Sequence, residues 1–426
     1  MADADGAGER PASPGRAAAL LLRLAWRNLW RNPRRSLLTL SAVAFAAAIL
    51  VFMVALQLGA YGAMIESAVG VFQGHLQVQV AGYREKPRLR TSIEGAPAVA
   101  ADVAAVPGVE AVALRAQAAA MVSSPARSYG AQVVGVEPAR EPEVSTLPGL
   151  VRRGRFLAAD DAPEAVVGET LARNLSLAVG DEVTVLGQGR DGSLAVAVLE
   201  VVGVFESGVP ELDRRVLEMP LKTFQEVFAM PGEAHAVVVK TRDLEAVEGV
   251  AAAVRRPLAD RGGLAVLTWD ELMVGIRQAI ALDMAVGWFL YAALVVVVTF
   301  SILNTFLMAV LERTRELGVL LALGTRPGFL GRLLVLESLL LLLLGLALGI
   351  LLGAAVAGYF SLHGLAFPGS EELFAQWHLP ARWHPRINLL ALTAGPAAIL
   401  ATTLIAALFP LLRVRRLRPT EAMRAV

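Results

Sequence analysis

Residues Ser338–Phe360 read SLLLLLLGLALGILLGAAVAGYF, and none of these 23 side chains carries a charge. A helix of about 20 residues spans the roughly 30 Å hydrocarbon core of a bilayer, because each residue adds about 1.5 Å along the axis. Only helices and closed barrels satisfy their backbone hydrogen bonds inside a membrane, and a continuous apolar run is typical of a helix. The stretch therefore predicts a transmembrane helix.

Three further stretches have the same character. They contain no charged residue over 25, 28 and 26 positions, and they are Ser36–Ala60, Met284–Leu311 and Ile387–Leu412. The first is longer than the roughly 7–15-residue core of a secretion signal, so we expect an uncleaved anchor. All 77 charged residues lie on the 324 residues outside the four runs, at a density close to that of soluble domains. The composition thus indicates a membrane protein with a soluble domain, and it excludes disordered, nucleic-acid-binding and strongly acidic proteins.

Arginine is distributed unevenly among the segments that connect the four runs. Residues 1–35, 312–337 and 413–426 contain seven, four and five arginines, whereas the connection 361–386 contains two. Because cytoplasmic connections carry an excess of Lys and Arg, this distribution predicts that both termini are cytoplasmic. The 223-residue segment Tyr61–Asp283 then lies outside the cytoplasm.

The outer segment combines patterns of strands and short helices. Apolar and polar residues alternate over His75–Val80, as in a half-buried strand. Further strands are expected over 182–186, 194–204, 215–219, 236–240 and 264–267, and helices over 97–106, 169–177, 221–228 and 244–257. Interleaved strands and helices indicate an α+β domain. The predicted fold class is a membrane α-helical protein with four transmembrane helices and a large α+β periplasmic domain inserted between helices 1 and 2.

The second transmembrane helix is expected to extend beyond the bilayer. From Trp269 to Leu311 we expect an unbroken helix of about 42 residues, or ~63 Å, which is twice the bilayer core. The patterns together divide the chain into a disordered leader (1–16), an interfacial amphipathic helix (17–35), a first span (36–60), the periplasmic domain (61–269), a stalk with the second span (270–311), a cytoplasmic coupling segment (312–332), a third span (333–360), a short periplasmic loop (361–386), a fourth span (387–412) and a basic cytoplasmic tail (413–426).

The chain lacks the motifs of several kinds of chemistry. Residues Gly187–Gly192 match G-x-G-x-x-G, but a strand pattern follows the glycines where a dinucleotide site requires a helix, so we expect a hairpin loop. None of the three lysines follows a glycine, which excludes a Walker A loop. The sequence contains no cysteine, the histidines have no close metal-ligand spacing, and no nucleophile–base set is evident. We therefore expect no catalytic residue, metal site or bound cofactor, and any ATP must bind to another subunit.

Two patterns point to contacts rather than chemistry. Gly345, Gly349 and Gly353 recur every four residues, which places them on one helix face where a second helix can approach closely. The connection Glu312–Gly324 reads ERTRELGVLLALG, with charged residues at the membrane exit followed by a short apolar helix that ends at the final glycine. Its apolar side chains require a groove, either at the membrane or on a partner protein.

This connection, together with the arginine that follows it, carries a family resemblance. ERTRELGVLLALGTRP (312–327) resembles the E-R-x-R-E-I-G-x-L-x-A-L-G segment of ABC-transporter permeases of the FtsX/MacB/LolC–LolE superfamily. LAWRNLWRNPRRSLLTL (24–40) resembles the family's basic entry to its first span, and RRLRPTEAMRAV (415–426) its usual ending. GHLQVQVAGYREKP (74–87) and the segment 201–228 resemble the outer domain of the lipoprotein-releasing LolC/LolE type.

The resemblance implies a particular assembly and mechanism of transport. Two four-span permeases pair in the bacterial inner membrane, each on a cytoplasmic ATPase subunit that binds ATP and Mg²⁺, and ATP-driven motion moves cargo by mechanotransmission. The residues that would engage the ATPase are Glu312, Arg313, Arg315, Glu316, Leu317, Gly318, Leu320 and Arg326. In the lipoprotein-releasing type, acylated proteins enter between the first two spans and pass to a periplasmic carrier. The corresponding acyl-chain surface here would comprise Phe45, Ile49, Phe52, Met53, Trp288, Tyr291 and Phe300.

Other functions stay open at this point. A MacB-like exporter of peptides or drugs is one alternative, although MacB carries its ATPase domain on the same chain. An FtsX-like activator of a periplasmic cell-wall hydrolase is a second, and a membrane-anchored enzyme is a third. The sequence does not distinguish a second copy of this permease from a paralogue as its partner, and it does not identify the cargo.

Overall fold

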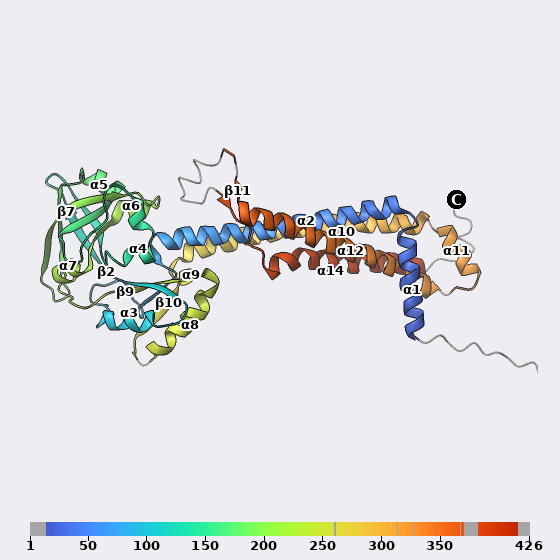
Figure 1. The fold of residues 1–426 in the computed structure, drawn as a ribbon, viewed down its shortest axis with the longest axis horizontal. Helices are drawn as coiled ribbons and strands as arrows, with labels where there is room; N and C mark the ends of the chain where they lie inside the picture. The colour runs from blue at the N-terminus through green and yellow to red at the C-terminus, as the bar shows by residue number, and fades with distance from the viewer. Residues whose placement is uncertain are drawn as a thin grey trace, which may run out of the picture. The chain divides into compact units, whose positions relative to one another are not determined.

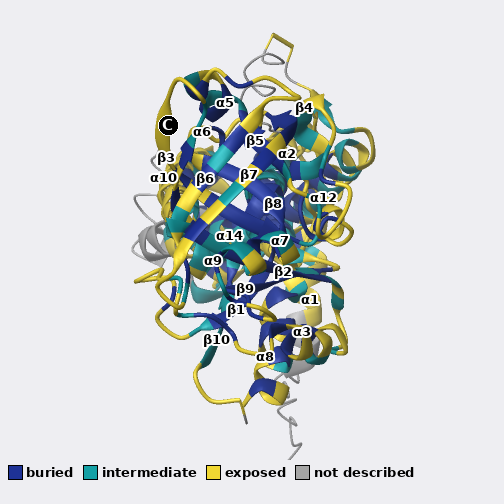
Figure 2. Ribbon diagram, turned by 90° about the vertical axis from the view of Figure 1, so that its left-hand side faces the viewer, coloured by how far each residue is buried: buried dark blue, intermediate teal, exposed yellow. Residues whose placement is uncertain are grey.

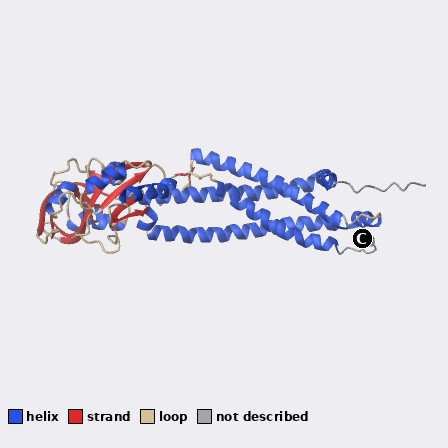
Figure 3. Ribbon diagram, turned by 90° about the horizontal axis from the view of Figure 1, so that it is seen from below, coloured by secondary structure: helices blue, strands red, loops and turns tan. Residues whose placement is uncertain are grey.

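The fold is taken from a computed structural model, which describes residues 14–259, 261–312, 314–325, 327–366, 368–369 and 382–415. The chain divides into two compact units. The first, here called the helical unit, comprises residues 1–60, 282–365 and 382–426, and the second, the sheet unit, comprises 61–281 and 366–381. Figure 3 shows long helices in the former and most of the strands in the latter.

Four helices are long and apolar enough to span a membrane, as the sequence predicted. They are α2 (Pro33–Ala68), α10 (Val274–Glu312), α12 (Pro327–His363) and α14 (Leu389–Arg415). Two shorter helices accompany them in the helical unit, α1 (Pro14–Leu29) and α11 (Thr314–Ala322). Figure 1 shows α1 crossing the ends of the long helices, where the exposed Trp26 of α1 and the exposed Trp30 just after it suit an interfacial position.

The helical unit has a shared apolar core. Val43 and Leu50 of α2, Val295 of α10, Leu342 of α12 and Ile399 of α14 are all buried in one cluster. A hydrogen bond of 2.7 Å between the hydroxyls of Thr299 and Thr402 also joins α10 to α14. Because lipid is as apolar as these side chains, close packing and interhelical hydrogen bonds hold such a bundle together.

The sheet unit contains one ten-stranded sheet with the order β10-β1-β9-β2-β3-β8-β5-β7-β4, and β6 pairs with β2 and β7. The strands are β1 (Leu76–Val80), β2 (Val109–Ser123), β3 (Ser128–Val136), β4 (Val151–Gly154), β5 (Glu164–Gly168), β6 (Glu182–Gln188), β7 (Leu194–Phe205), β8 (Val216–Pro220), β9 (Ala236–Thr241) and β10 (Leu264–Thr268). Figure 2 shows β8 in the buried colour along its length. A two-stranded sheet, β11 (Leu365–Ala366) with β12 (Arg382–Trp383), lies apart from it in the chain.

Short helices and turns complete the sheet unit. They are the π-helix η1 (Val69–Gln73), α3 (Ala96–Ala104), α4 (Glu141–Val144), η2 (Leu147–Leu150), α5 (Glu169–Leu175), α6 (Pro210–Arg215), α7 (Leu221–Val227), η3 (Leu244–Ala246), α8 (Val247–Leu258) and α9 (Trp269–Leu272). The predicted α+β class is therefore confirmed. The predicted hairpin loop is also confirmed, because β6 and β7 are antiparallel neighbours with Gln188 opposite Leu194.

The sequence missed four consecutive strands, from β2 to β5. The longest, β2, covers 15 residues and includes six alanines, a residue that is depleted in strands. Burial on the sheet overrides this preference, because Ala113 and Ala116 are fully buried. Local composition alone gave no sign of that burial.

The expected unbroken helix from Trp269 to Leu311 is wrong. A capping box formed by Thr268 and Glu271 caps the N-terminus of α9, which is a single turn long. The helix ends at Met273, whose backbone is not helical, with φ −116° and ψ 59°. Helix α10 starts anew at Val274 and runs for 39 residues. The acidic first turn that marked a helix start at Trp269 thus belongs to a separate short helix.

A buried cluster of charges lies within the sheet unit. Arg115 on β2 forms an ion pair with Glu141 of α4, and both side chains are almost completely buried. The Arg115 guanidinium also donates to the carbonyl of Phe72 and lies 4.3 Å from the centre of its ring. Glu218 on β8 is fully buried, and its two carboxylate oxygens have no hydrogen-bond partner among the described residues. Burial, reinforced by the neighbouring Glu141 and opposed by Arg115, raises the pKa of Glu218 to about 8.

Candidate functional site

The connection that follows α10 folds into the short helix α11, as predicted. Gly324 adopts a left-handed conformation with φ +94° just after the helix. The Thr325 N–H then donates to the Leu320 carbonyl at 3.0 Å and the Gly324 N–H donates to the Leu321 carbonyl at 3.0 Å. This pair of bonds is a Schellman motif, which explains why the helix ends at a glycine.

Helix α11 presents an apolar face that no described residue covers. Val319, Leu320 and Leu323 are 47%, 40% and 78% exposed, and their spacing places them on one side of the helix. Leu321 instead packs against the buried cluster of Phe306, Leu330 and Leu334. An uncovered apolar face on a short helix suits insertion into a groove on another protein.

Two ion pairs join the coupling segment to the start of the first span. Arg35 of α2 donates to Glu312 at 2.9 Å, and Arg31 pairs with Glu316 of α11. The sequence gave both glutamates a role in docking the ATPase, but it did not indicate their arginine partners. The pairs are only partly buried, so they orient α11 more than they stabilise the fold.

The other residues expected to engage an ATPase are distributed as follows. Gly318 is buried, and the side chain of Arg315 is exposed on α11. Arg313 and Arg326 lie outside the described residues, as does the side chain of Leu317.

The three glycines of the predicted packing face, Gly345, Gly349 and Gly353 of α12, all face α2. A Cβ atom added at Gly345 would lie 2.8 Å from Val43 Cβ, and one added at Gly349 would lie 2.6 Å from the Ala44 carbonyl oxygen. At Gly353 the added atom would lie 2.8 Å from Val51 Cβ. Since real Cβ atoms do not approach this closely, only glycine permits this separation of the two helices. The contact advances along both helices in the same direction, so α2 and α12 are parallel.

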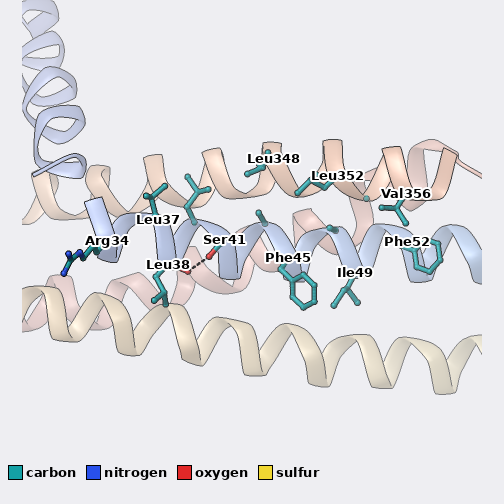
Figure 4. Close-up of a pocket in the computed structure, with 14 residues that line it drawn as sticks. Arg34, Leu37, Leu38, Ser41, Phe45, Ile49, Phe52, Leu348, Leu352 and Val356 are labelled. Atoms are coloured by element: carbon teal, nitrogen blue, oxygen red, sulfur yellow. Dashed lines mark hydrogen bonds between the residues drawn. The ribbon is translucent and has the colours of Figure 1, made fainter. Parts of the chain in front are cut away.

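An apolar groove of about 930 Å³ runs beside this contact. Figure 4 shows the side chains that line it on α2 and α12. Three of the residues expected to contact acyl chains line this groove, namely Phe45, Ile49 and Phe52, and they are joined there by residues of the third span that the sequence did not single out. The complete lining is Arg34, Leu37, Leu38, Leu40, Ser41, Ala44, Phe45, Ala48, Ile49, Phe52, Leu348, Leu352, Gly353 and Val356.

The remaining expected acyl-chain residues lie outside the groove. Met53 is 42% exposed on α2. Trp288 and Tyr291 of α10 make an edge-on ring contact at 6.0 Å, and Phe300 of the same helix is 66% exposed. Helix α10 is the least buried of the four spanning helices, so it offers an apolar surface for further contacts.

Polar side chains join α2 to α10 near these aromatic residues. The Tyr291 hydroxyl donates to Gln57 Oε1 at 2.9 Å, and Gln57 Nε2 lies 3.5 Å from Asp283 Oδ2. Gly287 allows this approach, because a Cβ atom there would lie 2.6 Å from Gln57 Nε2. The sequence missed this contact, since Gln57 and Asp283 are far apart in the chain and neither belongs to a motif.

The sheet unit contains a basic cleft of about 850 Å³. Arg88, Arg90 and Arg215 line it, and no lining residue is acidic. Among the described residues these arginines form no ion pair. Asp191 lies nearby, and hydrogen bonds from Ser193, together with the charge of Arg90, lower the pKa of Asp191. The floor is formed by β2 and β3, where Gly130 faces open space. Such a cleft suits an anionic partner.

A buried histidine fixes one wall of the basic cleft. The Gln117 N–H donates to His235 Nδ1 at 2.9 Å, so His235 Nε2 carries the proton and donates to the Leu89 carbonyl at 3.0 Å. Burial lowers the pKa of His235 to about 4, which keeps the ring neutral near pH 7. Its ring also stacks on Tyr83 at 5.1 Å. The loop that carries Arg88 and Arg90 is thereby held against the sheet.

Comparison with known families gives two matches. The model of the MacB-like periplasmic core domain matches residues 36–256, and that of the FtsX-like permease C-terminal domain matches residues 288–419. The first match covers more than half of the chain, and together they include α12 and α14, most of α2 and α10, and strands β1 to β9.

Individual relatives are distant but cover much of the chain. The lipoprotein-releasing system transmembrane protein LolC of Neisseria meningitidis is 23% identical over 72% of this chain and 75% of its own length. The macrolide export ATP-binding/permease protein MacB of Nitrobacter winogradskyi is 25% identical over 94% of this chain and 59% of its own length. The solved periplasmic region of MacB from Actinobacillus actinomycetemcomitans is 15% identical, with a TM-score of 0.37 over 51% of this chain and 97% of that one.

Proposed function

Because the chain belongs to the family of ABC transporter permeases with a MacB-like periplasmic core domain and an FtsX-like C-terminal domain, we propose that it is the permease of a lipoprotein-releasing transporter. In this role it extracts lipoproteins from the outer leaflet of the inner membrane and transfers them to a periplasmic carrier. The transporter works by mechanotransmission, driven by two copies of a cytoplasmic ATPase subunit. ATP and Mg²⁺ bind to that subunit and not to this chain.

The exposed apolar face of α11 is the observation that carries this proposal. Members of the family are permeases that work with an ATPase subunit. Such a subunit binds the permease through an element that protrudes from it. Leu320 and Leu323 supply the apolar contact. Glu312 ties the same segment to Arg35 of α2, and Glu316 ties it to Arg31 in the turn just before α2. A movement of α11 would therefore be passed directly to the first span.

The cargo assignment is supported by the membrane-facing surfaces. The LolC relative named above belongs to a lipoprotein-releasing system, and the lipid-like portion of such a cargo needs an apolar surface within the bilayer. Met53 on α2, with Trp288, Tyr291 and Phe300 on α10, provides one. A second permease, either a further copy or a paralogue, would cover the exposed side of α10.

The basic cleft is our candidate contact for the periplasmic carrier. Its three arginines lack carboxylate partners within the described residues, and the neutral His235 keeps the wall in place. A carrier with an acidic rim would meet this surface with complementary charge. The orientation that this requires has both termini in the cytoplasm and the sheet unit in the periplasm.

The proposal is tested on the complex purified from native membranes in mild detergent. We expect an ATPase subunit and acylated proteins to co-purify with the chain, and the ATPase rate to rise when a triacylated protein is added. The same protein without its acyl chains is the control and is expected to leave the rate unchanged. Equal stimulation by both forms would contradict lipoprotein release.

A MacB-like exporter is the second candidate, because the match to MacB extends over 94% of the chain. In that case a soluble peptide or a macrolide would stimulate the ATPase and acylated proteins would not. An FtsX-like activator would instead retain a cell-wall hydrolase and transport nothing. The same purification distinguishes all three functions.

A further inference from the structure

The groove between α2 and α12 has a charged end. Arg34 lies in the first turn of α2 and lines one end of the groove, and Phe52 lines the other. The 18 residues that separate them correspond to about 27 Å of helix, which is most of the roughly 30 Å hydrocarbon core. Figure 4 shows the Arg34 side chain beyond the apolar side chains of the groove.

Arg34 differs from its arginine neighbours in its partners. Arg31 pairs with Glu316 and Arg35 pairs with Glu312, whereas Arg34 forms no ion pair in the part of the chain that the structure describes. Within that part, the groove therefore ends at a guanidinium whose charge no carboxylate neutralises.

The rest of the groove offers no other polar partner to a ligand. Ser41 is the second polar residue in the lining, and its hydroxyl donates to the Leu38 carbonyl of its own helix at 3.0 Å. The walls beyond it are formed by residues such as Phe45, Leu348 and Leu352. The complementary ligand has one anionic end and a long apolar body.

We propose that this groove binds a phospholipid with an anionic headgroup. Its phosphate accepts hydrogen bonds from Arg34, since the planar guanidinium fork matches phosphate oxygens. One acyl chain lies along Phe45 and Leu348. A zwitterionic headgroup fits less well, because the lining contains no carboxylate for its ammonium group and the nearby Glu312 and Glu316 are already paired with arginines.

The position of Arg34 distinguishes this lipid from the acyl chains of the cargo. Under the orientation proposed above, Arg34 lies at the cytoplasmic end of α2, whereas a lipoprotein cargo is anchored in the opposite leaflet. The bound lipid is thus a resident component of the permease. It would hold the first and third spans together on the side of the bundle where Arg31 and Arg35 contact the coupling segment.

The test counts the lipids that stay bound to the full chain. The protein is reconstituted in nanodiscs with equal amounts of phosphatidylglycerol and phosphatidylcholine, extracted into detergent and measured by native mass spectrometry. We expect one phosphatidylglycerol per chain. The Arg34→Gln variant should retain at least about fivefold less, as expected for one arginine near the headgroup region. Arg23→Gln removes an exposed arginine of α1 outside the groove, and it should leave retention unchanged.

A second variant tests the apolar part of the same groove. Ser41→Phe fills the groove from an exposed position and keeps the charge of Arg34, so it should also expel the lipid while the protein still folds with an unchanged helix content. Equal retention by wild type and Arg34→Gln would overturn the proposal. Equal retention of the two lipids by the wild type would also overturn it. The same holds if the wild type retains an acylated protein in place of the phospholipid. None of these outcomes depends on whether the transporter releases lipoproteins.

Discussion

Arg35 donates a hydrogen bond through Nη1 to Glu312 Oε2 at 2.9 Å, joining the first turn of α2 to the last residue of α10. Arg31, in the turn that precedes α2, forms a second connection by pairing with Glu316 of α11. The start of the first span and the coupling segment are thus tied together at two points. In a permease driven from the cytoplasm, this arrangement lets a movement of α11 reach the first span without passing through the rest of the bundle.

Exchanging the charges of Arg35 and Glu312 tests this connection. Arg35→Glu or Glu312→Arg alone places like charges together, and each is expected to reduce ATP-dependent release several-fold. The double variant restores the pair and should recover most of the activity. Because the pair is partly exposed, stability should change by only about 1 kcal/mol or less in any variant. Measurement of release and of melting temperature for all four proteins forms a double-mutant cycle, and purely additive losses would argue against coupling through this pair.

Leu320→Asp is expected to uncouple the ATPase. The substitution places a charge on the apolar face of α11, where Leu320 is 40% exposed and so is not needed for the fold. We expect the ATPase to dissociate and cargo release to fall to background, with an unchanged melting temperature. Leu194→Asp is the matched control, since Leu194 is 74% exposed on β7 in the sheet unit. A Leu320→Asp protein that binds the ATPase and releases cargo normally would rule out α11 as the coupling helix.

Gly349→Ala is expected to destabilise the helical unit. The new Cβ atom would lie 2.6 Å from both the Ala44 carbonyl oxygen and Ala47 Cβ, so α2 and α12 must separate. Overpacking of this kind typically costs about 1–3 kcal/mol. At Gly358 on the same helix the nearest atom is 3.8 Å away, so Gly358→Ala should be neutral or slightly stabilising. Thermal unfolding in detergent checks both, and equal melting temperatures would contradict the packing argument.

Glu218→Gln is expected to stabilise the sheet unit at alkaline pH. Burial raises the pKa of Glu218 to about 8 in the folded state. Between an unfolded pKa near ~4.3 and the folded value, the folded state binds more protons, so stability falls as the pH rises. The glutamine variant removes this loss, and its advantage should grow from pH 5 to pH 9 to as much as a few kcal/mol.

The opposite sign is expected at Glu164. A hydrogen bond from Arg155 lowers the pKa of Glu164, so this carboxylate contributes stability above its unfolded pKa and loses it as the pH falls through the folded value. Glu164→Gln should therefore be less stable than wild type at pH 7, by about 1 kcal/mol or less because Arg155 is exposed. The difference should vanish in acid. Melting curves across pH 3–9 test both glutamates, and parallel curves for Glu218→Gln and wild type would contradict the buried-charge account.

Gly130→Leu is expected to block the basic cleft. A Cβ atom added at Gly130 would have no atom within 4 Å, and the residue does not require a positive φ, so a larger side chain can be accommodated without strain. We expect carrier binding to fall at least tenfold with an unchanged melting temperature. Gly249→Leu is the control, because Gly249 is equally unobstructed on α8 and lies outside the cleft. Equal carrier binding by the two variants would show that the carrier does not bind in the basic cleft.

The sequence predicted the parts of the fold that depend on neighbouring residues. Charge-free runs identified the four spanning helices, and Gly324 identified the end of α11, because both signals lie within one segment. Strand β2 was missed because its alanines become strand residues only when other strands bury them. Arg31 and Glu316 are 285 positions apart, and Phe45 and Leu348 come to line the same groove only through the fold. Such contacts are decided by packing, which local patterns do not encode.

The central claim is that this chain couples ATP hydrolysis to the release of acylated proteins. The most direct measurement is ATP-dependent release of a triacylated protein from proteoliposomes that contain the purified complex and a soluble acceptor. We predict that release requires ATP and the acyl chains, and that it is lost in the Leu320→Asp variant. ATP hydrolysis without release, or equal release of the same protein without its acyl chains, would contradict the account.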